Sequence, residues 1–205
     1  MTLSHRLRKY LVMGSQDCVK DPLETLSEAV SGGITAFQFR EKGDGSMEWK
    51  DKVELGRALK RVCDANNVLF VVNDDIRLFE VLDAEAIHVG QEDVHVESIR
   101  AAYPDAAIGL SLSDRNHLEQ SPLHLVDYVG AGPIFPTSTK RDANPVTGPE
   151  FIRDIRMTHP ELPVVGIGGI DEHNAHLVME AGAAGVAVVS AVTKAADIER
   201  AVQSL

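Results

Sequence analysis

The sequence predicts a (β/α)8 TIM barrel, formed as a single compact domain over residues 1–205. Short apolar or β-branched runs recur along the chain and alternate with segments of helical spacing. None of the runs shows a long apolar/polar alternation, which is typical of strands covered on both faces of a parallel sheet. Turn residues lie at most junctions, and no Pro/Ser-rich linker divides the chain. Eight such units favour a small closed barrel over an open doubly wound sheet.

The expected strands are the apolar runs themselves. The second of them, at residues 34–39, follows the pair Gly32-Gly33 and ends just before the turn residues Gly43, Asp44 and Gly45. Glycine is common in such turns because it adopts backbone conformations closed to other residues. The eight runs lie at residues 10–13, 34–39, 68–72, 86–89, 107–110, 128–131, 164–167 and 186–189.

The expected helices lie between the strands, and the first shows the signals most fully. Asp21 is a suitable N-cap, Pro22 suits the first turn, and Gly32-Gly33 ends the helix. The longest helix is expected at residues 47–66. The others are expected at residues 76–82, 96–103, 115–120, 149–157, 171–181 and 195–202.

The composition is that of an ordinary soluble protein, with 44% hydrophobic and 25% charged residues. A formal net charge of −11 argues against sequence-independent binding of nucleic acid, which needs a basic surface. Cys18 and Cys63 show no CxxC or Cys/His spacing, so we expect ordinary thiols of a reducing compartment. No signal peptide or membrane-spanning run is evident, and we expect a cytoplasmic protein. A homo-oligomer is compatible with these features.

In a barrel of this kind the chemistry lies at the C-terminal ends of the strands. Alternate side chains of a strand share a face, so Gln38, Arg40 and Lys42 should point one way and Phe39 and Glu41 the other. An amide and two cations at a strand end can form an anion-binding site. Polar residues expected at the same mouth are Asn73, Asp74, Gln91, Glu92, Asp93, Ser111, Gly168, Gly169 and Ser190.

Two carboxylates follow the third and fourth strands and predict a metal site. Asp74 and Asp93 should meet, because adjacent strands are about 5 Å apart. Mg²⁺ is usually held by one or two carboxylates together with substrate phosphate and water. With Arg40 and Lys42 beside them, the two aspartates predict a Mg-diphosphate site, whereas Asp75 is expected to cap the next helix.

A second anion-binding site is expected on the other side of the mouth. The loop at residues 133–140 is rich in hydroxyls and ends in Lys140, and Gly168-Gly169 and Ser190 follow the last two strands. Such loops bind phosphate in these barrels through backbone N–H groups. His88 lies within the fourth strand and is expected to be an interior or rim residue rather than a base. The other histidines are expected to be solvated.

Two anion-binding sites with room for two substrates are suited to joining a diphosphate ester to a monophosphate, with diphosphate leaving. The motifs resemble those of the thiamin phosphate synthase (thiamine-phosphate pyrophosphorylase) family over nearly all of residues 10–190. The motifs that carry the resemblance are QFREK at 38–42, VNDD at 72–75, HVGQED at 88–93, GPIFPTSTK at 132–140 and GIGGI at 166–170.

The resemblance implies a Mg²⁺-dependent (β/α)8 transferase. Its substrates would be 4-amino-2-methyl-5-hydroxymethylpyrimidine diphosphate and 4-methyl-5-(2-hydroxyethyl)thiazole phosphate, and its products thiamin phosphate and diphosphate. The pyrimidine CH₂–O bond would break to give a carbocation that the thiazole nitrogen attacks, so the protein need supply no nucleophile. Arg40, Lys42, Lys140 and Ser111 would be the catalytic residues.

The resemblance also assigns residues to each ligand. The pyrimidine diphosphate would contact Gln38, Phe39, Arg40, Glu41, Lys42, Asn73, Ser111 and Lys140, although strand alternation turns Glu41 away, toward a pairing role behind the strand. Asp74 and Asp93 would hold one Mg²⁺. Thr137, Ser138, Thr139, Gly169, Val189 and Ser190 would bind the thiazole phosphate. The sequence departs from its relatives at residues 111–114, where Ser-Leu-Ser-Asp replaces a His- or Thr-containing stretch.

Two other functions compete with this interpretation. A thiazole tautomerase of the same fold would need a histidine base, for which His88 is the candidate. It would have no use for Asp74 and Asp93 together with Lys140. A non-catalytic protein that senses thiazole or thiamin phosphates would need the site but no turnover.

Overall fold

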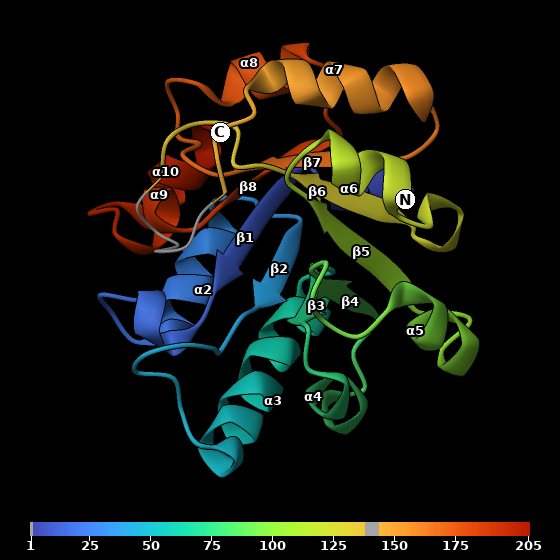
Figure 1. Ribbon diagram of the computed structural model, residues 1–205. Helices are drawn as coiled ribbons and strands as arrows, with labels where there is room; N and C mark the ends of the chain where they lie inside the picture. Colours follow the sequence, from blue (N-terminus) through green and yellow to red (C-terminus); the bar gives the residue numbers. More distant parts are fainter. Residues whose placement is uncertain (1, 138–143) are drawn as a thin grey trace.

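The computed structural model describes residues 2–137 and 144–205, and within them eight parallel strands close into a barrel (Figure 1). Each strand pairs with the next along the chain, and β8 pairs with β1. The predicted (β/α)8 barrel is therefore confirmed. The strands are β1 (Lys9–Met13), β2 (Ala36–Phe39), β3 (Leu69–Asn73), β4 (Ala86–Val89), β5 (Ala107–Leu112), β6 (Tyr128–Ala131), β7 (Val164–Ile167) and β8 (Gly185–Val188).

Helices surround the barrel, and several begin where an aspartate side chain caps the first turn (Figure 1). Asp21 accepts hydrogen bonds from two backbone N–H groups at the start of α2, and Asp75 accepts one at the start of α4, as predicted. The helices are α2 (Pro22–Ser31), α3 (Trp49–Ala65), α4 (Ile76–Leu82), α5 (Val96–Ala102), α6 (Arg115–Gln120), α7 (Pro149–Thr158), α8 (Ala175–Glu180) and α10 (Ile198–Gln203), with 3-10 turns at Ser15–Asp17 and Leu123–Leu125.

Three of these helices begin later than the sequence predicts. The helix α3 starts at Trp49 rather than at residue 47, and in the other two a side chain organises a turn before the helix. Asp171 accepts from the N–H of His173, which forms a turn, so α8 starts at Ala175 rather than at residue 171. Asp197 caps the N–H of Arg200, so α10 starts at Ile198 rather than at residue 195.

Two short helices were not predicted, α1 (Leu3–Arg6) and α9 (Ser190–Thr193). Leu3 and the buried Leu7 pack against the cluster inside the barrel, so the segment before β1 closes the N-terminal end of the barrel. Arg6 forms a two-fold ion pair with Glu85, just before β4. The spacing of Leu3 and Leu7 is the helical signal that the sequence analysis missed.

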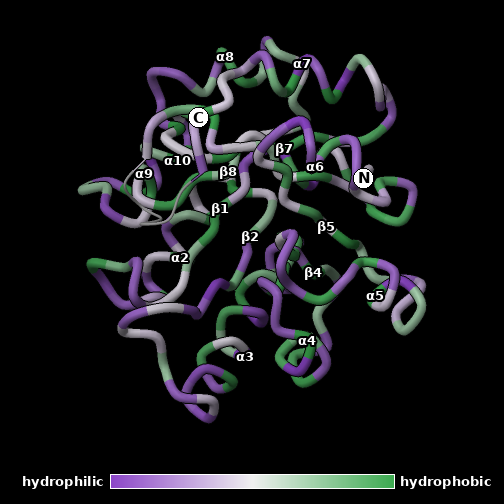
Figure 2. Tube along the Cα trace, in the orientation of Figure 1, coloured by the Kyte–Doolittle hydropathy of each residue, from purple (hydrophilic) through white to green (hydrophobic). Residues whose placement is uncertain are grey.

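The strands separate two apolar layers. Tyr10, Val12, Val71 and Tyr128 belong to a cluster inside the barrel, whereas alternate residues such as Leu11 pack outward against the helices. Both faces of each strand are thus covered, which explains the uninterrupted apolar runs of the sequence. Figure 2 shows hydrophilic residues gathered mainly over the loops and helices around the strands.

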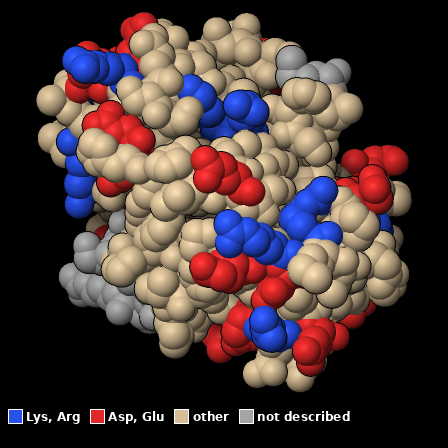
Figure 3. Space-filling view, turned by 90° about the horizontal axis from the view of Figure 1, so that it is seen from above, with Lys and Arg blue, Asp and Glu red and all other residues tan. Residues whose placement is uncertain are grey.

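The surface carries both signs of charge. On the face drawn in Figure 3, Lys and Arg side chains interleave with Asp and Glu, without a broad basic surface. Among the described residues, no helix is long and apolar enough to cross a membrane.

Candidate active site

One cation and two carboxylates meet where β2, β3 and β4 end. The ammonium Nζ of Lys42 lies 2.5 Å from Oδ2 of Asp74 and 3.8 Å from Oδ1 of Asp93. Its hydrogen bond to Asp74 raises the pKa of Lys42, which keeps the ammonium group charged. The structure therefore brings together the three charged residues that strand order predicted to be neighbours.

Backbone contacts hold each carboxylate in place. Asp74 has a left-handed backbone, with φ of 49°, and donates its N–H to the carbonyl of His88 at 2.9 Å. This conformation is uncommon outside glycine, although Asp adopts it more readily than most residues. Oδ2 of Asp93 accepts the N–H of Gly90 at 2.7 Å, which leaves Oδ1 directed toward Lys42.

Arg40 supplies a second cation beside this cluster. Its backbone is fixed by hydrogen bonds from its N–H to Met13 and from Nε2 of Gln16 to its carbonyl, both at 3.0 Å. Within residues 2–137 and 144–205, its half-buried guanidinium has no hydrogen-bond or ion-pair partner. Arg40 is therefore available to an anionic ligand.

Phe39 and Glu41 lie on the other face of the same segment, as strand alternation predicts. Phe39 is 1% exposed and packs in the outer core. Glu41 is 3% exposed, and its carboxylate accepts hydrogen bonds from the N–H and hydroxyl of Ser15 and from the N–H of Met47. Because both side chains are buried, their contact with the pyrimidine diphosphate stays a prediction, and it would be made through the backbone rather than the side chains.

The even-numbered face leads into a polar network inside the barrel. Gln38 donates to the hydroxyl of Tyr10, which bonds to that of Tyr128, and Tyr128 in turn contacts His88. His88 also contacts Ser111, at 2.9 Å. Burial lowers the pKa of His88 to about 4, so its ring is neutral at pH 7. The interior placement of His88 is confirmed.

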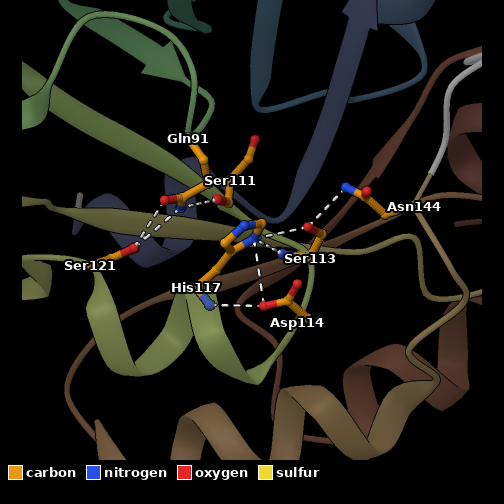
Figure 4. A network of polar contacts seen from close by, with 7 residues as sticks. All are labelled: Gln91, Ser111, Ser113, Asp114, His117, Ser121 and Asn144. Atoms are coloured by element: carbon orange, nitrogen blue, oxygen red, sulfur yellow. Dashed lines mark hydrogen bonds and ion pairs between the residues drawn. The ribbon is translucent and has the colours of Figure 1, made fainter.

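The loop between β5 and α6 carries a second network, drawn in Figure 4. The hydroxyl of Ser113 lies 2.9 Å from Nδ1 of His117 and accepts from Nδ2 of Asn144, also at 2.9 Å. Asp114 lies near the same ring nitrogen, at 3.8 Å, and caps the N–H of His117. Because Ser113 and Asp114 both approach Nδ1, this group is not arranged as a Ser-His-Asp relay.

A neighbouring contact in Figure 4 fixes the end of β5 itself. Nε2 of Gln91 donates to the carbonyl of Ser111 at 2.8 Å and to the hydroxyl of Ser121 at 3.2 Å. Gln91 therefore links the loop after β4 to β5, at the residue whose side chain contacts His88. This hydrogen bond positions the backbone of Ser111 at the mouth.

The loops after β6 and β7 are packed together. Phe135 donates its N–H to the carbonyl of Gly168 at 3.0 Å, and a Cβ on Gly169 would lie 2.4 Å from the carbonyl oxygen of Pro136. Gly168 and Gly169 also have positive φ values, 99° and 63°, so glycine is required there for two reasons. Thr137 continues from this packed segment, whereas Ser138, Thr139 and Lys140 lie outside the described residues.

The remaining residues predicted for the thiazole phosphate follow β8. Val189 and Ser190 begin the short helix α9, beside the loop after β7, since β7 pairs with β8. Backbone N–H groups at the start of such a turn have no partner within the helix, so they suit an anion.

The donor set fits a magnesium ion held partly by its ligand. Among the described residues, no group of three or more His, Cys, Asp or Glu side chains could hold a metal. Asp74 and Asp93 nevertheless converge on one cation, the ammonium of Lys42. Two carboxylates are what Mg²⁺ uses when phosphate oxygens and water complete its coordination.

The sequence analysis missed several residues of the site. Tyr10 and Tyr128 lie in apolar runs, where they resemble ordinary hydrophobic residues of a strand. That their side chains point into the barrel follows only from the register of the closed sheet. His117 was expected to be solvated, but it is half-buried against Ser113. The sequence signal for the side chains packed inside the barrel was the pair Gly109 and Gly130, because glycine in a strand marks a close approach.

The chain is similar to known proteins in both sequence and fold. A family model described as thiamine monophosphate synthase matches residues 9–192. The chain is 52% identical to a thiamine-phosphate synthase of Oceanobacillus iheyensis, covering 98% of both chains, and 45% identical to one of Anoxybacillus flavithermus, covering 96% of this chain and 90% of the relative. The solved structure of a thiamine phosphate pyrophosphorylase from Pyrococcus furiosus is similar, with a TM-score of 0.89, 33% identity, and coverage of 100% of this chain and 96% of that one.

Proposed function

The chain belongs to the thiamine monophosphate synthase family, and from that membership we propose the reaction that it catalyses. It is a transferase of thiamin biosynthesis. We propose that it condenses 4-amino-2-methyl-5-hydroxymethylpyrimidine diphosphate with 4-methyl-5-(2-hydroxyethyl)thiazole phosphate. The products are thiamin phosphate and diphosphate.

The observation that carries this proposal is the meeting of Lys42 with Asp74 and Asp93 at the ends of three neighbouring strands. A diphosphate needs cations, and a metal that bridges it to the protein needs carboxylates. Both are present within one small area, with Arg40 beside them. A site for a neutral substrate would have no use for this combination of charges.

Asp74 and Asp93 are the residues that would hold Mg²⁺. When bound, the ion would neutralise charge on the diphosphate. Gly90 keeps one oxygen of Asp93 occupied and directs the other into the site. Lys42 lies against both carboxylates, so its ammonium would share the diphosphate with the ion.

The chain itself supplies electrostatic stabilisation and positioning in the proposed mechanism. The CH₂–O bond of the pyrimidine substrate breaks, and its electron pair leaves with the diphosphate oxygen. Arg40, Lys42 and Lys140 stabilise the negative charge that develops there, and Ser111 donates a hydrogen bond. The thiazole nitrogen then attacks the resulting CH₂ carbocation and forms the new C–N bond.

Backbone groups are proposed to hold the thiazole phosphate on the opposite side of the mouth. Gly169 packs against Pro136, which is followed in the sequence by Thr137, Ser138 and Thr139, and Val189 and Ser190 follow β8, the strand paired with β7. Binding there would place the thiazole for attack, which removes much of the entropic barrier. Excluding water would protect the carbocation from hydrolysis.

His88 argues against the tautomerase alternative. Both of its ring nitrogens are engaged, one by Tyr128 and the other by Ser111, and its pKa is lowered to about 4. Neither nitrogen is free to take a proton from a substrate. We further propose that the enzyme works in the cytoplasm, since both cysteines are free thiols.

The test is an assay with the purified protein, both substrates and Mg²⁺. We expect thiamin phosphate and diphosphate in equal amounts, and no product after chelation of the metal. Isomerisation of a thiazole without the pyrimidine substrate would identify a tautomerase instead. Binding of either phosphate without turnover would identify a sensor protein.

A further inference from the structure

A continuous row of hydrogen-bonded side chains crosses the barrel interior from β2 to β5. Nε2 of Gln38 donates to the hydroxyl of Tyr10 at 2.9 Å, and the hydroxyls of Tyr10 and Tyr128 lie 2.9 Å apart. The hydroxyl of Tyr128 lies 3.1 Å from Nδ1 of His88, and Nε2 of His88 lies 2.9 Å from Oγ of Ser111. Four strand positions are thus linked to a hydroxyl at the mouth.

The first donor fixes the direction of the next hydrogen bonds. An amide nitrogen only donates, so the hydroxyl of Tyr10 accepts from Gln38. Its own proton then needs an acceptor, and among the described contacts the hydroxyl of Tyr128, 2.9 Å away, is the one within reach. Tyr128 then gives its proton to Nδ1 of His88. Burial raises the pKa values of both tyrosines, so each keeps the proton that it donates.

The same direction continues through His88. Because Nδ1 accepts from Tyr128, it carries no proton, and the ring proton is on Nε2. Nε2 therefore donates to Oγ of Ser111. The hydroxyl proton of Ser111 is left free to point into the mouth.

The barrel makes room for this row by omitting two side chains. A Cβ on Gly109 would lie 2.2 Å from Cζ of Tyr128 and 2.3 Å from Nδ1 of His88, and a Cβ on Gly130 would lie 3.1 Å from Cε1 of His88. Gly109 is the register partner of both His88 and Tyr128. The sequence thus admits the imidazole and the phenol together, independently of the hydrogen bonds.

We propose that His88 is a positioning residue, which holds Ser111 with its hydroxyl proton directed at the anion bound in the mouth. This inference rests on the proposed function, in which that anion is the leaving diphosphate. A row of aligned hydrogen bonds polarises its last member, so Ser111 becomes a stronger donor than an isolated serine. The reaction gains from this as negative charge develops on the diphosphate oxygen.

The opposite direction makes a different prediction about the same ring. If Gln38 accepted through Oε1, every donor would reverse, and His88 would carry its proton on Nδ1. Ser111 would then donate into the barrel and present lone pairs to the mouth, which suits an anion poorly. The position of the His88 proton therefore separates the two arrangements.

The first experiment determines that tautomer by NMR on the full chain with ¹⁵N-labelled histidine at pH 7.5. The chain has 8 histidines, and comparison with the His88→Gln variant assigns the signals of His88. We expect a protonated Nε2 and an unprotonated Nδ1. A protonated Nδ1 would overturn the proposal. The readout needs no substrate and no turnover.

The second experiment measures binding of inorganic diphosphate with Mg²⁺ by titration calorimetry. We expect Ser111→Ala to weaken binding about tenfold or more, as for loss of a hydrogen bond to a charged group. Tyr128→Phe removes only the hydroxyl that orients His88, and should weaken binding by about threefold. Tyr103→Phe is the matched control, because its hydroxyl contacts Glu80 on the surface, and should have no effect.

The double variant distinguishes orientation from general destabilisation. In the Ser111→Ala background, Tyr128→Phe should cause no further loss of diphosphate binding, since the hydroxyl that it orients is gone. Equal losses in both backgrounds would overturn the proposal. The NMR result for His88 and the binding results for the single and double variants do not depend on turnover. If both are as expected but no thiamin phosphate forms, then the proposed function fails and the orientation of Ser111 stands.

Discussion

Lys42 lies against the two carboxylates proposed to hold Mg²⁺, with its ammonium 2.5 Å from Asp74 and 3.8 Å from Asp93. The pair is half-exposed, so its attraction is moderate. The same lysine can therefore neutralise the carboxylates in the free protein and contact the diphosphate in the complex. Two opposite effects of removing it follow from this relationship.

Lys42→Gln should bind Mg²⁺ more tightly but turn over more slowly. Without the competing ammonium group beside Asp74 and Asp93, the affinity of the substrate-free protein for Mg²⁺ should rise by about two- to fivefold. Loss of a cation at the leaving group should lower kcat by about 100-fold. Calorimetry without substrate and steady-state kinetics measure the two effects.

Lys52→Gln is the control for Lys42→Gln. Lys52 pairs with Asp75 at 2.9 Å, one residue away from the proposed metal ligand. The Lys52→Gln variant should have an unchanged affinity for Mg²⁺ and an unchanged kcat. Weaker Mg²⁺ binding in Lys42→Gln would show that the lysine supports the metal site rather than competing with it.

Asp93→Asn should make the reaction depend on much higher Mg²⁺. The amide keeps the shape of the side chain and can still accept the N–H of Gly90, so the charge is what is lost. We expect the Mg²⁺ concentration for half-maximal rate to rise about tenfold or more. The neighbouring exposed Glu92→Gln removes the same charge nearby. A wild-type Mg²⁺ response in Asp93→Asn would remove the metal assignment.

Gly109→Ala should be strongly destabilising, and Gly130→Ala only mildly so. The first Cβ would overlap Tyr128 and His88, whereas the second would approach His88 at 3.1 Å. Overpacking of this kind costs about 1–3 kcal/mol. Urea unfolding of the two variants provides the comparison. Equal stabilities would mean that the interior row is more adaptable than the packing implies.

Stability should fall above pH 9 through Cys63. Burial raises the pKa of its thiol from 9.0 to about 12. The unfolded chain therefore loses this proton first, and the contribution of the neutral thiol is lost as pH rises from 9 toward 12. At pH 10 the loss is about 1.4 kcal/mol for this group. Urea unfolding at pH 8 and pH 10 should show a smaller difference in Cys63→Ala, and an unchanged difference would contradict the assignment.

The barrel was predictable from local patterns, because each strand is buried on both faces and each junction carries turn residues. The convergence of Lys42, Asp74 and Asp93 followed as well, since parallel strand ends meet at one mouth. The row through Tyr10 and Tyr128 was not predictable in the same way. It depends on the register of strands that are far apart in sequence, and a tyrosine in an apolar run gives no sign of its partner.

The network of the β5–α6 loop shows the same limit. Ser113 lies just after β5, and its partner Asn144 lies 31 residues further along the chain. Nothing local in either segment predicts the contact. The closed barrel brings the two loops together at the mouth, so only the folded arrangement shows this hydrogen bond.

Asn144→Ala should impair turnover more than stability. Asn144 joins its segment to Ser113, and three residues later the N–H of Thr147 bonds to the carbonyl of Pro133 at 2.9 Å. Lys140, the residue proposed to contact the diphosphate, precedes Asn144 by four residues in the sequence, so loss of this anchor should weaken that contact. We expect a several-fold lower kcat, by about five- to tenfold, for a pair worth about 1 kcal/mol.

Ser113→Ala and the double variant complete the cycle with Asn144→Ala. If the two side chains act through their mutual hydrogen bond, the double variant should be no slower than either single one. Thr158→Val serves as a control on α7, where the hydroxyl bonds only to its own helix. Additive losses of kcat would show that Asn144 and Ser113 act separately, in which case Ser113 would affect the site through His117 instead.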